Sequence, residues 1–174
     1  MNRKKSGDEA EQFVSEYLSK KTCVTEIHPR TYRPLIGKDG KSIYHNGRPL
    51  FISKDNDYHN SFDIKAECPK YLLYVQSKFQ GVETGAIQNN NIVGAMRNID
   101  KNFPYNFPYI RIQIWLLWKE WVKHEGERRH KEYKFRIWER TGFKAVMING
   151  IHKFKGEWIE MSREDFDKEM QVIE

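Results

Sequence analysis

NSFDIKAECPKYLLYVQSKF, residues 60–79, contains the clearest secondary-structure signal in the chain. Two segments rich in apolar and β-branched residues flank Pro69, a pattern typical of a β-hairpin. We expect strands at 62–66 and 71–78, joined by a turn over residues 67–70. The rest of the domain can be worked out from this hairpin.

Polar side chains gather on one face of the predicted hairpin. Residues two apart in a strand share a face, so Gln76 and Lys78 project together and Ser77 projects the other way. With that turn, Asp63 faces Tyr74, and Gln76 lies on the diagonal, about 7–8 Å away. The sequence therefore predicts that an acid, an amide and an amine from two strands converge.

These residue types suit a hard divalent cation such as Mg²⁺ or Mn²⁺, because Mg²⁺ prefers oxygen ligands and keeps several waters. We expect Asp63 to supply the charge, with neutral oxygens from the Gln76 amide and the main-chain carbonyl of Ser77. Glu11, in the first predicted helix, is a fourth candidate ligand. Lys78 would position a water molecule or offset charge on a phosphate, while the metal lowers the pKa of bound water. The predicted catalytic residues are Glu11, Asp63, Gln76 and Lys78.

Hydrophobic periodicity and turn residues predict the other elements. The central hairpin is expected to be one part of an α/β domain with a mixed sheet. In chain order we expect a helix at 7–20, a strand at 23–27, an inserted loop or hairpin at 30–60, the central hairpin, a helix at 86–100, strands at 109–118, 133–138 and 144–148, and a helix at 162–170 capped by Ser162.

The length of 174 residues predicts one domain. Its core would cover about residues 5–118, and a C-terminal β-hairpin and helix would cover about 119–174. Aromatic residues make up 14% of the chain, which excludes a disordered protein. The longest apolar run, at 114–118, is five residues long, whereas a membrane span needs about 20. We therefore expect no membrane span.

Charge is distributed unevenly along the chain. The formal net charge is +6, but residues 156–174 contain seven acidic and two basic residues, so residues 1–155 carry +11. A basic body suits a polyanion such as nucleic acid, because neutralising phosphates releases counterions. The charge is thus consistent with a nucleic-acid partner and does not distinguish DNA from RNA.

The charged connector at 122–131 and the strand after it are candidate phosphate contacts. A solvated turn is the alternative interpretation of the connector. His124 and His130 flank it without the sequence spacing of a metal site. The predicted nucleic-acid-binding residues are Arg128, Arg129, Lys131, Lys134 and Arg136.

Two cysteines are too few for a disulfide scaffold, and they form no CxxC pair. We expect Cys23 and Cys68 to be small core residues. The simplest interpretation is a reducing, cytoplasmic location.

Three segments together resemble the PD-(D/E)XK nuclease superfamily, most closely its archaeal Holliday-junction resolvases. GDEAEQFV at 7–14 resembles the first-helix motif and places Glu11. SFDIKA at 61–66 resembles the strand that carries the metal-binding aspartate, and places Asp63. YLLYVQSK at 71–78 resembles the strand that carries the (D/E)XK signature, with Gln76 in place of the usual acid.

This resemblance implies a restriction-endonuclease-like core of order αβββαβ and Mg²⁺-dependent cleavage of DNA, including branched DNA. It also implies a homodimer. Because Gln76 replaces an acid, a nucleic-acid-binding module without catalysis remains the alternative function. A third possibility is a structural or partner-binding protein that uses the Trp-rich segment 115–121 as an interface.

Overall fold

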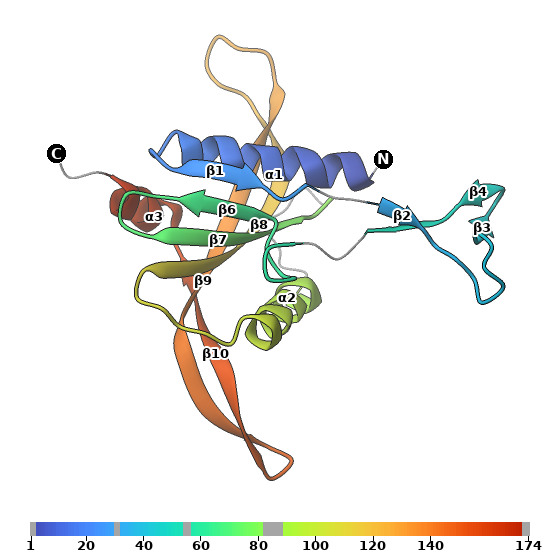
Figure 1. Ribbon diagram of the computed structural model, residues 1–174. Helices are drawn as coiled ribbons and strands as arrows, with labels where there is room; N and C mark the ends of the chain where they lie inside the picture. Colours follow the sequence, from blue (N-terminus) through green and yellow to red (C-terminus); the bar gives the residue numbers. More distant parts are fainter. Residues whose placement is uncertain (1–2, 30–31, 54–56, 82–88, 172–174) are drawn as a thin grey trace.

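The computed structural model describes residues 3–29, 32–53, 57–81 and 89–171. Its elements follow the chain from the N-terminal helix to the C-terminal helix (Figure 1). They are α1 (Arg3–Ser19), β1 (Val24–Ile27), β2 (Tyr32–Pro34), β3 (Tyr44–His45), β4 (Arg48–Pro49), β5 (Phe51–Ser53), β6 (Ile64–Glu67), β7 (Leu72–Phe79), α2 (Asn89–Asn102), β8 (Ile110–Val122), β9 (His130–Ile148), β10 (Ile151–Met161) and α3 (Arg163–Met170).

A six-stranded mixed sheet of order β1-β6-β7-β8-β9-β10 forms the centre of the protein. β7 and β8 are parallel, and every other neighbouring pair is antiparallel. The parallel pair requires a crossover connection, and α2 lies within it. The predicted α/β class with a mixed sheet is therefore confirmed.

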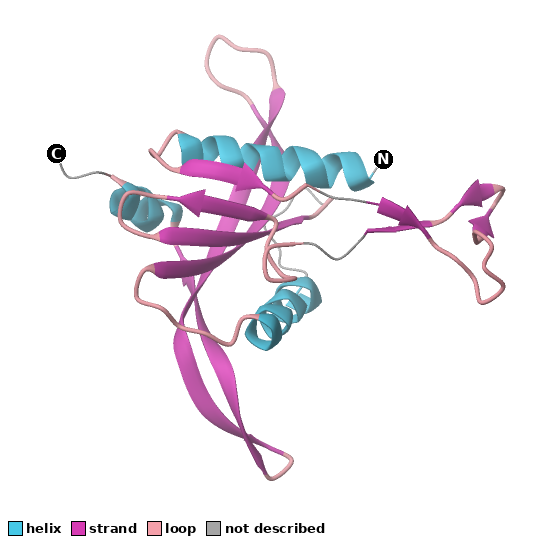
Figure 2. Cartoon of the chain, viewed as in Figure 1, coloured by secondary structure: helices cyan, strands magenta, loops and turns pink. Residues whose placement is uncertain are grey.

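Helices cover both faces of the sheet (Figure 2). Apolar residues of α1 and α3 pack with one set of strand residues, including Leu73 and Val75. Apolar residues of α2 pack with the alternate set, including Tyr74 and Ile114. Since side chains alternate along a strand, Gln76 belongs to the α2 face of the sheet.

The central hairpin forms, but with a different register from the predicted one. Ile64 pairs with Val75, and Ala66 pairs with Leu73. The connection is a tight turn in which the Cys68 N–H donates to the Tyr71 carbonyl at 3.0 Å. The predicted turn at residues 67–70 is therefore wrong, because β6 extends to Glu67. The change of register is an even number of residues, so each side chain keeps its predicted face.

The strands near the C-terminus are longer than the hydrophobic periodicity predicts, and there is one more of them. The expected strands at 133–138 and 144–148 are one continuous strand, β9, and β10 was not predicted. The first half of β9 pairs with β8 and the second half pairs with β10. The far half of the β9–β10 hairpin projects from the body as a two-stranded ribbon (Figure 1).

The predicted insertion and terminal helix are also present. The insertion forms two small sheets, β2–β5 and β3–β4, which project from the body (Figure 2). The Ser162 Oγ accepts from the Asp165 N–H at 3.0 Å, so the predicted cap of α3 is confirmed. The predicted start of the second helix, at residues 86–88, lies outside the described residues.

Cys23 lies in the core on the α1 face and Cys68 packs against it, as predicted, and the two form a disulfide that was not predicted. They lie one position beyond the Val24–Glu67 pair of the β1–β6 ladder, and their Cα atoms are 4.2 Å apart. Two cysteines directly opposite each other on adjacent strands are close enough for a disulfide. The sequence does not reveal which residues lie opposite, because that depends on the register of the strands. Because the two cysteines are paired, their small number does not indicate a reducing location.

None of the helices in the described part of the chain combines the length and hydrophobicity needed to cross a bilayer.

Candidate functional site

The structure brings Asp63, Gln76 and Ser77 together at the end of the central hairpin. Asp63 comes directly before β6, and its N–H donates to the Val75 carbonyl at 3.0 Å. Its Oδ2 accepts from the Gln76 Nε2 at 2.5 Å and from the Ser77 N–H at 2.8 Å. The expected convergence of acid and amide is thus direct contact across the hairpin, not the predicted diagonal.

This contact is buried. Asp63 is 4% exposed and Gln76 is 7% exposed. Acidic residues are seldom buried to this degree unless they are paired or bound to a cation. Carboxylate and amide oxygens are ligands that a hard cation prefers, but here the amide directs its nitrogen to the carboxylate.

Lys78 lies two residues beyond Gln76 on β7, and therefore on the same face. It pairs in register with Leu116 of β8 and is half-buried. Two residues along a strand correspond to about 7 Å, which the long lysine side chain can span. Lys78 therefore lies on the correct sheet face, and close enough along β7, for its ammonium to reach a phosphate bound at Asp63.

Glu11 is buried in α1, with 4% of its surface exposed. α1 packs on β6 and β7, and its neighbouring residue Ala10 belongs to the core on the α1 face of the sheet. Gln76 belongs to the α2 face, whereas Asp63 precedes β6 and its carboxylate reaches the Ser77 N–H. The burial of Glu11 is consistent with a ligand role, and its place at the Asp63 site stays a prediction.

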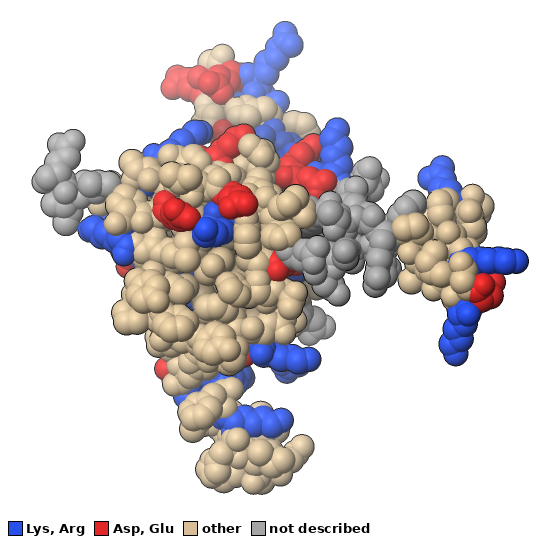
Figure 3. Space-filling model, in the orientation of Figure 1, with Lys and Arg blue, Asp and Glu red and all other residues tan. Residues whose placement is uncertain are grey.

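Three of the five predicted nucleic-acid contacts lie on the two faces of the β8–β9 hairpin, and two lie in its loop. Lys134 and Arg136 lie on the face of Gln76, since Arg136 pairs with Leu116 in the next strand. Lys131 lies on the opposite face, with its Nζ 5.1 Å from the centre of the Trp121 ring. Arg128 and Arg129 are exposed in the β8–β9 loop. Figure 3 shows that basic side chains are prominent on the projecting hairpins.

Two of these basic side chains already have acidic partners. Arg136 donates from both Nε and Nη2 to the carboxylate of Glu160, at 2.6 Å each. That bidentate bond raises the pKa of Arg136. The Lys134 ammonium lies 3.9 Å from Glu132. Arg128, Arg129 and Lys131 are exposed, so their side chains are accessible for phosphate contacts.

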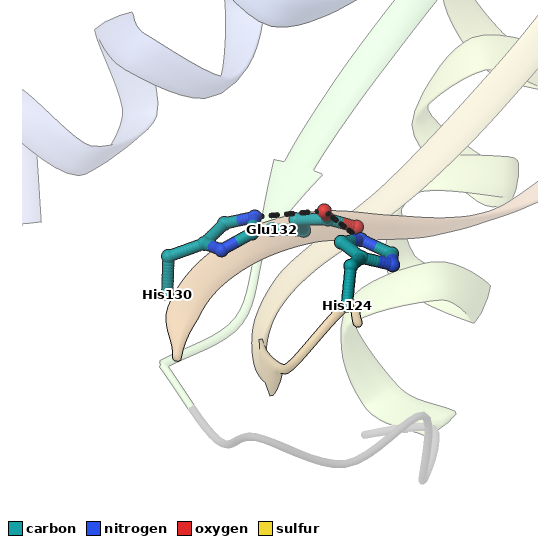
Figure 4. Close-up of side chains that lie close together, drawn as sticks. All are labelled: His124, His130 and Glu132. Carbon is teal, nitrogen blue, oxygen red and sulfur yellow. Dashed lines mark hydrogen bonds and ion pairs between the residues drawn. The ribbon is translucent and has the colours of Figure 1, made fainter. Parts of the chain in front are cut away.

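A second group of polar side chains lies at the β8–β9 hairpin: His124, His130 and Glu132 (Figure 4). The Nε2 atoms of His124 and His130 lie 2.7 and 2.9 Å from the same oxygen, Oε1 of Glu132. The sequence spacing of the two histidines matches no metal site, yet the fold brings one ligand atom from each of them and from Glu132 within 4.8 Å of one another. Val122 pairs with His130, so strand pairing brings together residues whose sequence spacing matches no metal motif.

Hydrogen bonds within this group shift two pKa values. The carbonyl of Arg128 and then the carboxylate of Glu132 raise the pKa of His130. Hydrogen bonds from His124 and His130 lower the pKa of Glu132.

Comparison with known proteins finds no matching family model, no significantly similar curated protein and no significantly similar solved structure. The function must therefore be inferred from the residues of this chain and their geometry.

Proposed function

We propose that this protein is a metal-dependent nuclease that hydrolyses phosphodiester bonds in DNA, with its active site at Asp63, Gln76 and Lys78. The observation that carries the proposal is the contact of the buried Asp63 carboxylate with Gln76 and with the Ser77 N–H. The order α1-β1-β6-β7-α2-β8 supports a restriction-endonuclease-like core, since it follows the αβββαβ order that the motifs imply.

The donor set fits a hard divalent cation, Mg²⁺ or Mn²⁺. Asp63 and the Gln76 amide oxygen would hold the ion, with the Ser77 carbonyl and Glu11 as further ligands. A half-turn of the amide about its last side-chain bond exchanges the Gln76 nitrogen for its oxygen at Asp63. The ion would activate water and neutralise charge on the phosphate.

Protein groups around the ion would hold the Asp63 carboxylate in place, stabilise charge on the phosphate and attract the DNA. The Ser77 N–H holds one carboxylate oxygen of Asp63 and so fixes the plane of that carboxylate. The Lys78 ammonium offsets negative charge on the phosphate as the P–O bond breaks. Basic residues of the body, which carries +11 before the acidic C-terminal segment, would attract the DNA.

Asp63→Asn tests the proposal, because it keeps the shape of the side chain and removes its charge. We expect the parent to cut linear or four-way-junction DNA when Mg²⁺ or Mn²⁺ is added, and the variant to bind DNA without cutting it. Asp39→Asn, in the exposed insertion, is the control and should cut like the parent. Equal cleavage by Asp63→Asn would refute the assignment.

A nucleic-acid-binding module without catalysis is the second candidate, and the orientation of Gln76 favours it. The amide presents its nitrogen to Asp63, so the two side chains satisfy each other without an ion. This candidate predicts DNA binding by the parent with no cleavage in Mg²⁺ or Mn²⁺. Metal-dependent cleavage by the parent would exclude it.

A further inference from the structure

We propose that His124, His130 and Glu132 form a second metal site, which binds one divalent transition-metal ion of the zinc type at the β8–β9 hairpin. The proposal is independent of the nuclease proposal. His130 and Glu132 lie on the same sheet face as Gln76 but far along the strands, because Gln76 is level with Ile114 and His130 is level with Val122. Eight residues of β8 separate these positions by about 27 Å. His124 follows β8 in the β8–β9 loop.

The distances between the ligand atoms of the three side chains support a metal site. One ligand atom from each of the three side chains lies within 4.8 Å of the other two. A tetrahedral zinc ion about 2.0–2.1 Å from each ligand separates neighbouring ligand atoms by roughly 3.3 Å. The two contacts to Glu132, at 2.7 and 2.9 Å, would therefore need to open by only about half an ångström.

The hydrogen bond at the other ring nitrogen of His130 also supports a metal site. Its Nδ1 lies 3.1 Å from the Arg128 carbonyl, which fixes the ring with Nε2 directed at Glu132 (Figure 4). Histidines that bind metals commonly donate their other ring N–H to a carbonyl in this way. The hydrogen bond leaves the Nε2 lone pair to face the ion.

The ligand types select the class of ion. Two imidazoles and one carboxylate suit zinc, cobalt or nickel, whereas Mg²⁺ prefers an all-oxygen site. The side chains of His124 and His130 are 58% and 42% exposed, so the site is open to solvent and water can fill the fourth position. Such an ion would link the end of β8 to β9 and close the loop that carries Arg128 and Arg129.

Titration with Zn²⁺ by calorimetry tests the proposal. It is carried out on the full chain with Asp63→Asn, so that the first site does not contribute. This background protein should bind one Zn²⁺, and adding His124→Ala should weaken binding by more than the 10- to 100-fold that loss of an outer partner costs. His152→Ala, at an exposed histidine of β10, is the matched control and should leave the affinity unchanged. Equal Zn²⁺ affinity with and without His124→Ala would overturn the proposal.

Cobalt provides a second readout that does not depend on heats of binding. Co²⁺ bound by imidazoles in a tetrahedral site absorbs visible light strongly, and this band should be lost in His124→Ala and in Glu132→Gln. Circular dichroism checks that both variants fold, which is expected because the side chains of His124 and Glu132 are 58% and 34% exposed. Absence of the cobalt band in the Asp63→Asn background protein would also overturn the proposal.

Discussion

The contact between Asp63 and Gln76 is the central feature at the scale of single residues. A buried carboxylate is costly unless donors surround it, and here a side-chain amide and a main-chain N–H both donate to Oδ2. The amide stabilises the charge without adding another. A second acid at this position would hold a cation more strongly and would be less stable without one.

Gln76→Glu should therefore make stability depend on Mg²⁺. Without Mg²⁺ the variant loses a donor and gains a repelling charge, so we expect the free energy of unfolding to fall by about 1–3 kcal/mol. Adding Mg²⁺ should restore most of this loss. Urea unfolding with and without Mg²⁺ measures both effects.

The control for this prediction is Gln12→Glu. Gln12 also donates to a carboxylate, that of Glu16 at 3.0 Å, but the pair is exposed on α1. We expect only a few tenths of a kcal/mol there, with no response to Mg²⁺. A similar Mg²⁺ response in both variants would argue against an ion at Asp63.

A set of hydrogen bonds joins the elements α2, β9 and β10. Asp100 of α2 accepts from the Gly156 N–H at 3.0 Å and from the Arg140 guanidinium at 3.3 Å. Arg140 also donates to the Tyr105 carbonyl at 2.7 Å. Burial lowers the pKa of Arg140, and Asp100 opposes that shift. The base of the β9–β10 ribbon is thereby attached to the helix on the α2 face.

Gly156→Ala should loosen this attachment. An added Cβ would lie 2.8 Å from the Trp158 Nε1 and closer still to Asp100, so the buried groups must move apart. We expect a loss of about 1–3 kcal/mol in the free energy of unfolding, measured in urea. Gly142→Ala in β9 is the matched control, because its nearest neighbouring atom is 4.0 Å away. Equal losses at both glycines would contradict the proposed role of the attachment.

At the scale of secondary-structure elements, the face on which a strand side chain lies can be predicted from the sequence. Alternation along 71–78 correctly places Gln76 and Lys78 on one face, because that alternation follows from strand geometry alone. The register of the β6–β7 pair cannot be predicted in the same way. A tight turn at Pro69 and a longer turn are both compatible with the same alternation of apolar and polar residues. The group around Glu132 and the disulfide were missed for a related reason: both depend on which strands pair and in what register.

At the scale of the whole molecule, the acidic C-terminal segment forms ion pairs with the basic body. Glu160 binds Arg136, Asp167 lies 3.1 Å from Lys21, and Glu169 lies 2.6 Å from Arg111. The projecting ribbon differs, because residues 142–156 include no acid. Strand register places three of its lysines on one face; these ribbon lysines are Lys144, Lys153 and Lys155.

Replacing the ribbon lysines with glutamine should weaken DNA binding. If each contacts one phosphate, the slope of log affinity against log salt concentration should become shallower by about 3. Fluorescence anisotropy at several salt concentrations measures this slope. The charge-matched control replaces three exposed lysines of the body, Lys5, Lys20 and Lys70. An equal change of slope in the control would mean that only the net charge matters.

The disulfide between Cys23 and Cys68 has a consequence for the inserted segment. The two cysteines are 45 positions apart, and both small sheets of the insertion lie between them. A protease that nicks the insertion therefore produces two fragments that remain covalently tethered until a reductant is added. Variation in the length or sequence of this segment is confined to a closed loop whose two ends are fixed at adjacent strands, so the insertion can diverge while the central sheet stays intact.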